Sequence, residues 1–151
     1  MDIEQEHVQE VYQELDELLH DYFEKTIAKE GLPILNMDWR SYFELQKREH
    51  LMLLTARDDY RGRLMGFVMY YIYPHLHHKG FICAACDILA VRLEQRGRGI
   101  GMLLMEHAEP LLKDHRVRYI THQFRVCYDT APLFPRMGYK LIEQGYLKEL
   151  D

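Results

Sequence analysis

The sequence is poor in cysteine and in long hydrophobic runs, and each shortage excludes a class of protein. Its 151 residues include three cysteines, too few and odd in number for a disulfide framework, which predicts a reducing compartment. No apolar run reaches the ~18–20 residues of a membrane-spanning helix. The N-terminus is acidic and polar, the reverse of a signal peptide. We therefore expect a cytoplasmic protein with no membrane partner.

The residues that are present indicate a folded protein. Hydrophobic residues make up 48% of the chain and charged residues 28%, which excludes intrinsic disorder. The length predicts one domain over residues 1–151. The net charge of −5 comes from the first 30 residues, where ten acidic residues accompany two lysines. Because the remainder carries only a small positive excess, nucleic acid is not expected as the main partner.

Hydrophobic spacing predicts an alternation of helices and strands, and hence an α/β fold. Apolar residues three and four apart predict a helix over residues 4–29 and a second one from residue 36 or 38 to about 49. The remaining predicted elements are strands over 51–56, 64–73 and 81–91, a helix through 103–112, a strand over 117–126, a short helix over 129–137 and a strand over 139–144.

A glycine-rich basic loop, Gln-Arg-Gly-Arg-Gly-Ile-Gly from Gln95 to Gly101, connects the strand over 81–91 to the next helix. Free N–H groups at a helix N-terminus favour an anion, and glycine removes Cβ atoms that would keep a diphosphate away. The loop lacks the Gly-Lys-Ser/Thr of a Walker motif, and a Rossmann fingerprint would need glycine at Met102. A tight basic turn without a ligand is the plainer interpretation.

The spacing Arg96-x-x-Gly99-x-Gly101 resembles the Arg/Gln-x-x-Gly-x-Gly/Ala motif of the GNAT superfamily of acyl-CoA-dependent N-acyltransferases. The strand before the loop and Met137-Gly138-Tyr139 support the resemblance, which extends over about residues 51–144. It implies a GNAT-like fold, with a central mixed, splayed β-sheet flanked by helices and two N-terminal helices. It also implies acetyl-CoA as cosubstrate, and direct attack by a primary amine in a ternary complex.

The same resemblance implies which residues bind coenzyme A. They are Leu89, Ala90, Val91, Arg96, Gly97, Arg98, Gly99, Ile100, Gly101, Cys127 and Phe134. Family members often carry Asn and Tyr where this chain has Cys127 and Phe134, and that Tyr commonly protonates the departing thiolate. Phe134 has no proton to give, which leaves Tyr128, Tyr139 or water to supply one.

Two side chains are candidates to accept the proton of the attacking amine. Asp87 lies midway along an apolar strand, where a carboxylate is costly to bury unless it is paired or functional. His122 shares a strand face with apolar residues, so a packed core histidine is the alternative. No metal is expected, because Cys83 and Cys86 fall on opposite faces of a strand.

The sequence thus predicts an N-acetyltransferase that acts on a small-molecule or protein amine. The alternative is a catalytically impaired CoA-binding module that works through a protein partner, because Phe134 lacks the usual hydroxyl. The apolar residues near the end of the chain, 146–150, also suit a homodimer.

Overall fold

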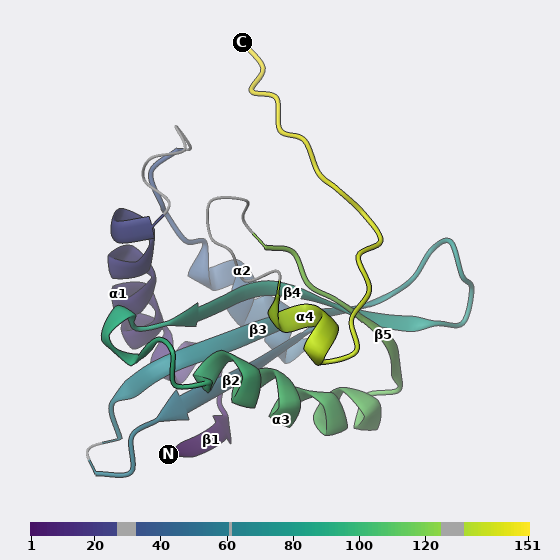
Figure 1. Cartoon of the computed structure of the whole chain (residues 1–151). Coiled ribbons are helices and arrows are strands. Elements are labelled where there is room, and N and C mark those ends of the chain that lie inside the picture. Colours follow the sequence, from purple (N-terminus) through teal and green to yellow (C-terminus); the bar gives the residue numbers. More distant parts are fainter. Residues whose placement is uncertain (27–32, 61, 125–131) are drawn as a thin grey trace.

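Helices and strands alternate along the computed structural model (Figure 1), in which residues 1–26, 33–60, 62–124 and 132–151 are described. The elements are β1 (Asp2–Gln5), α1 (Val8–Thr26), α2 (Trp39–Lys47), β2 (Leu51–Arg57), β3 (Leu64–Pro74), β4 (Ile82–Val91), a 3-10 turn η2 (Leu93–Gln95), α3 (Ile100–Asp114), β5 (Val117–Thr121) and α4 (Leu133–Arg136). No helix in the described ranges is long and apolar enough to cross a membrane.

The strands form one five-stranded mixed sheet in the order β1-β2-β3-β4-β5. The pairs β1/β2, β2/β3 and β3/β4 are antiparallel, whereas β5 runs parallel to β4 after the crossover through α3. Within the described residues, β5 pairs with residues 82–85 of β4 and no further along that strand. The prediction of an α/β fold with a central mixed sheet flanked by helices is confirmed.

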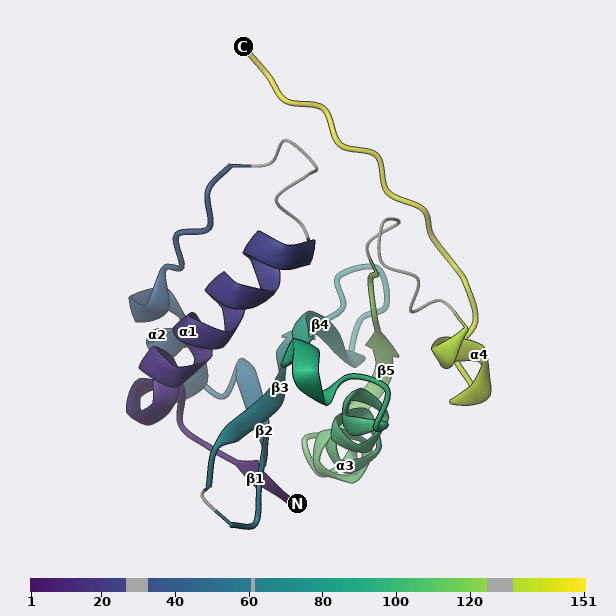
Figure 2. The ribbon, with the colours of Figure 1, turned by 60° about the vertical axis from the view of Figure 1, so that its left-hand side comes forward.

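The two faces of the sheet are covered by different helices, as Figure 2 shows. Helices α1 and α2 pack on one face, where Leu15, Leu18 and Leu19 are buried against Phe67 and Met69. Helix α3 packs on the other face. Burying each such side chain stabilises the fold by about 1.5–3 kcal/mol. Successive side chains of a strand point to opposite faces of the sheet, so the same strands contribute residues to both hydrophobic cores.

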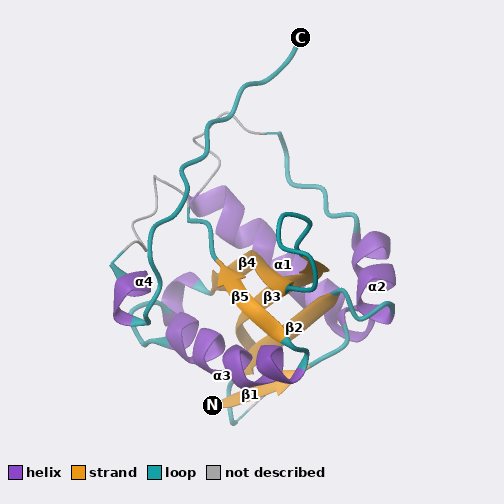
Figure 3. Ribbon diagram, turned by 90° about the vertical axis from the view of Figure 1, so that its right-hand side faces the viewer, coloured by secondary structure: helices purple, strands orange, loops and turns teal. Residues whose placement is uncertain are grey.

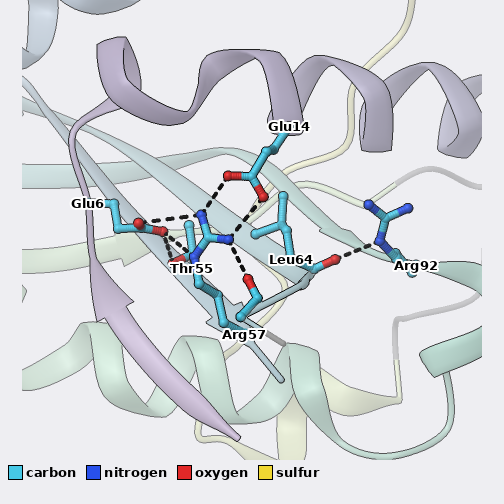
Figure 4. A network of polar contacts seen from close by, with 7 residues as sticks. Glu6, Glu14, Thr55, Arg57, Leu64 and Arg92 are labelled. Carbon is cyan, nitrogen blue, oxygen red and sulfur yellow. Dashed lines mark hydrogen bonds and ion pairs between the residues drawn. The ribbon is translucent and has the colours of Figure 1, made fainter. Parts of the chain in front are cut away.

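The predicted start of the first helix is wrong, because residues 2–5 form an edge strand and α1 begins at Val8. Long-range contacts hold this strand. The Glu6 carboxylate accepts hydrogen bonds from Thr55 and from Arg57 Nε at 2.9 Å, and Arg57 also bonds Glu14 at 3.0 Å (Figure 4). Partners some 50 residues away leave no trace in local hydrophobic spacing.

The predicted last strand, residues 139–144, is also wrong, because residues 138–151 contain no strand. Leu141 and Ile142 are 73% and 71% exposed, and Figure 3 shows this segment running away from the sheet, of which β5 is the edge. The last residues of the predicted first helix, of the strand over 117–126 and the start of the short helix over 129–137 lie outside the described residues.

Candidate active site

The loop before α3 and the first turn of that helix, from Arg96 to Gly101, form an open backbone surface that we call the glycine cradle. Gly97 and Gly99 have φ angles of 78° and 77°, in the left-handed region, and Gly99 is the N-cap of α3. Side chains rarely adopt this conformation. A Cβ built at either glycine would meet no heavy atom within 4 Å, so the space in front of the loop is open. The first N–H groups of α3 face that space without helical partners.

A cavity of about 210 Å³ lies at this helix terminus. Its lining contains many of the residues predicted to bind coenzyme A, namely Leu89, Val91, Arg96, Gly97, Gly99, Ile100 and Gly101. Ala90 is buried on the α1 side of the sheet, and Arg98 is exposed with its guanidinium bonded to Gln95 at 3.1 Å. Phe134 lies beside His122, whereas Cys127 falls outside the described residues.

Helix α1 contributes a residue to this cavity that the sequence analysis missed. Tyr22 lines the cavity, and its ring centroid lies 5.1 Å from the guanidinium carbon of Arg96. This distance is within the range of a cation–π contact. Because the two residues are far apart in the chain, only the packing of α1 over the end of β4 reveals the pair. Leu133 from α4 also lines the cavity.

A β-bulge in β4 lies directly before the cavity. Tyr70 pairs with Cys86 and Met69 with Ile88, so Asp87 has no partner across the ladder to β3. A bulge re-aims side chains and commonly marks a functional position. Asp87 is two residues from Leu89 of the cavity lining, a distance of about 6–7 Å along a strand.

The Asp87 carboxylate faces α2 and is held by a tyrosine. Tyr42 Oη donates a hydrogen bond to Asp87 Oδ2 at 2.6 Å, and Tyr71 Oη donates to Tyr42 Oη at 3.4 Å. Burial, together with the bond to Asp87, raises the pKa of Tyr42 well above its ordinary value, so this phenol keeps its proton. The buried carboxylate is therefore paired, and its partner is the phenol of Tyr42.

His122 lies on the opposite, α3 side of the sheet, just beyond β5. Its Nε2 is 2.9 Å from Tyr70 Oη, and the rings of Phe134 and Tyr139 lie 5.4 and 5.3 Å away. Burial lowers the pKa of His122 to about 4, so the imidazole is neutral at pH 7 and accepts protons weakly. This environment suits a packed, hydrogen-bonded histidine.

A second cavity, of about 470 Å³, lies on the α1/α2 side of the molecule. It is lined by Tyr12, Gln13, Asp16, His20, Leu35, Asn36, Met37 and Trp39. Trp39 donates a hydrogen bond from Nε1 to Asp16 at 2.8 Å, and its ring lies 5.5 Å from Tyr42. This cavity is therefore linked through two aromatic rings to the face on which Asp87 lies. Among the described residues, no group of three metal-ligating side chains is present.

Comparisons with known proteins agree with this arrangement. A sequence model of the family described as acetyltransferase (GNAT) matches residues 12–139. The chain is 34% identical, over 91 residues, to the uncharacterised N-acetyltransferase CT2212 of Chlorobaculum tepidum. That match covers 60% of this chain and 52% of the relative, so the chain spans about half the length of the curated relative it matches.

Solved structures are similar over almost the whole chain. The BH1408 protein of Bacillus halodurans, as a tetramutant, is similar with a TM-score of 0.80 and 20% identity, covering 99% of this chain and 100% of that one. A ribosomal-protein-alanine N-acetyltransferase from Brucella melitensis is similar with a TM-score of 0.73 and 22% identity, covering 99% of both chains. At this level of identity, the likeness shows a common fold.

Proposed function

The chain belongs to the acetyltransferase (GNAT) family, and on that premise we propose that it transfers an acetyl group from acetyl-CoA to a primary amine. The observation that carries the proposal is the open glycine cradle at α3, which lies directly beyond the bulge that holds Asp87. Along the chain, the carboxylate at the β4 bulge is thus followed first by the end of that strand and then by the glycine loop at the start of α3.

The residues present fit the diphosphate of coenzyme A. The outward N–H groups of Gly99, Ile100 and Gly101 would bond its oxygens, and Arg96 would add positive charge. Each hydrogen bond to a charged group contributes about 1.5–3 kcal/mol. Open positions without Cβ atoms at Gly97 and Gly99 allow the anion to approach the backbone.

The free edge of β4 fits the pantetheine arm. Among the described residues β5 leaves β4 after Ala85, so the strand from Cys86 to Val91 lacks a neighbour on that edge. Main-chain N–H and C=O groups there need partners. The main chain of Leu89 and Val91 would supply these to the amide groups of the arm, in the manner of an added strand.

The acceptor amine must lose a proton before or as it attacks the thioester. We assign that proton to Asp87, which takes it directly or through a water molecule. Tyr42 positions the carboxylate through its 2.6 Å bond. The amine nitrogen then bonds the carbonyl carbon, the C–S bond breaks, and the electron pair leaves on sulfur. The amine would approach from the α1/α2 face, on which Asp87 and the cavity that contains Asp16 lie.

The test is release of CoA from acetyl-CoA in the presence of a panel of primary amines, with the acetylated product identified by mass spectrometry. We expect amine-dependent release, and Asp87→Asn should lower kcat by about 10²–10⁴-fold without changing the Kd for CoA. The matched control is Asp114→Asn, an exposed carboxylate at the end of α3. Wild-type activity in Asp87→Asn would remove Asp87 from the mechanism.

Phe134 favours a second candidate function, a CoA-binding module without turnover, because this residue lacks the hydroxyl common in the family. Tight binding of acetyl-CoA with no CoA release for any amine in the panel would establish that alternative. Absence of acetyl-CoA binding would refute both.

A further inference from the structure

Phe134, in α4, and Tyr139, which follows the turn at Gly138, are neighbours in space. Gly138 has a φ angle of 84°, and after it the N–H of Tyr139 donates a hydrogen bond to the carbonyl of Phe134 at 3.0 Å. This left-handed turn folds the chain back on α4. The two rings consequently meet edge to face, with centroids 5.7 Å apart.

The hydroxyl of Tyr139 is buried and has no hydrogen-bond partner among the described residues. A buried hydroxyl without a partner is costly and calls for an explanation, such as a ligand. The nearby imidazole of His122 does not bond it: Nε2 lies 2.9 Å from Tyr70 Oη, and neither ring nitrogen forms a hydrogen bond with Tyr139. The Tyr139 ring instead stands at 90° to the imidazole ring, 5.3 Å away.

The contacts of Tyr139 connect it to the β4 bulge, because its ring lies beside His122, His122 bonds Tyr70, and Tyr70 pairs with Cys86 at the bulge. Burial, with Glu109 and Cys86 also acting on it, raises the pKa of Tyr139 to about 12, so it stays protonated at neutral pH. Cys86 directly precedes Asp87 and packs on the α3 side of β4, whereas Asp87 bonds Tyr42 on the α2 side. The carboxylate and the Tyr139 hydroxyl thus flank β4 from opposite faces.

We propose that Tyr139 donates a hydrogen bond to the coenzyme A sulfur as the C–S bond breaks, in place of the hydroxyl that Phe134 lacks. This inference rests on the proposed function. The sulfur takes the bonding electron pair and leaves as a thiolate, and it receives its proton afterwards from water. Tyr139 keeps its own proton throughout. The amine loses its proton on the Asp87 side, so the two charges of the reaction develop on opposite faces of β4.

The first test is Tyr139→Phe, which removes only the hydroxyl. We expect kcat to fall about 10- to 100-fold, the loss of one hydrogen bond to a charged group, while the KM for the amine is unchanged. Tyr146→Phe is the matched control, because Tyr146 is 95% exposed. Wild-type kcat in a folded Tyr139→Phe protein would overturn the proposal.

The second test needs no turnover. The free thiol of CoA has a pKa of about 8.5 by analogy with cysteine, so above pH 9 it is largely a thiolate that can accept a hydrogen bond from Tyr139. Calorimetry above pH 9 should therefore show that the wild-type protein binds CoA about tenfold more tightly than desulfo-CoA. Tyr139→Phe should lose this preference. Equal affinity of the wild-type protein for the two compounds across the pH range would overturn the proposal, even where the variant fails to fold.

A third variant separates a lost donor from lost packing. Phe134→Tyr combined with Tyr139→Phe returns the hydroxyl to the position usual in the family, and we expect it to restore kcat and the preference for CoA over desulfo-CoA. If the wild-type protein binds no acetyl-CoA, the proposed function itself fails. If it acetylates amines and Tyr139→Phe does so equally well, only the role of Tyr139 is lost.

Discussion

A leucine in place of Gly101 would fill part of the cavity at the glycine cradle while leaving the fold intact. Gly101 lies in the first turn of α3, and a Cβ built there meets only Leu89 Cδ2, at 3.8 Å, an ordinary van der Waals contact. Both residues line the 210 Å³ cavity. The side chain of Gly101→Leu would therefore extend into the space assigned to the diphosphate and the start of the pantetheine arm.

The size of the effect follows from the hydrogen bonds that are lost. If the leucine keeps the diphosphate from two outward N–H groups, at about 1.5–3 kcal/mol each, binding weakens by about 3–6 kcal/mol. This corresponds to a rise in Kd of roughly 10²–10⁴-fold. Stability should not fall, because leucine favours a helix over glycine by up to ~1 kcal/mol.

Isothermal titration calorimetry with CoA measures this change directly, and denaturant unfolding checks the fold. The control is Gly145→Leu, since Gly145 has open space around it and does not line the cavity. Gly145→Leu should bind CoA as the wild type does. A folded Gly101→Leu protein with wild-type affinity for CoA would refute the assignment of the cradle to the diphosphate.

Three further predictions test other parts of the structure. Arg57→Met should lower the free energy of unfolding by about 2–4 kcal/mol, because it removes the guanidinium that pairs the largely buried carboxylate of Glu6 and the half-exposed one of Glu14. As a control, Arg63→Met removes an exposed ion pair and should cost less than about 1 kcal/mol. His122→Asn should remove a pH dependence of the free energy of unfolding. The folded-state pKa of His122 is about 4 and the unfolded value is 6.5, so the wild-type protein loses stability as the pH falls from 6.5 to 4, by up to roughly 3 kcal/mol. Urea unfolding at a series of pH values measures this loss. Tyr42→Phe should lower kcat about tenfold and leave the Kd for CoA unchanged, because it frees Asp87 without touching the cradle; unchanged kcat would contradict the positioning role.

Much of the fold could be predicted from the sequence because its signals are local. Strands β2, β3 and β4 and helix α3 lie within a few residues of their predicted bounds. The second helix begins after Asp38, whose side chain accepts a hydrogen bond from the Ser41 N–H, as expected of an N-cap. Gly99 likewise caps α3 in a conformation that favours glycine.

The sequence by itself determined the order of the central elements, the position of the glycine loop and the identity of the family motif, because helix periodicity, capping and turn chemistry act between residues within a few positions of one another. Only the tertiary structure decided that Asp2–Gln5 joins the sheet, that Tyr22 lies over Arg96, and that Tyr42 holds Asp87 at a bulge. These contacts join residues 45 or more positions apart, as in the bond from Tyr42 to Asp87. They form because packing two helical layers on one sheet brings distant segments together, and no local pattern encodes which side chains then meet.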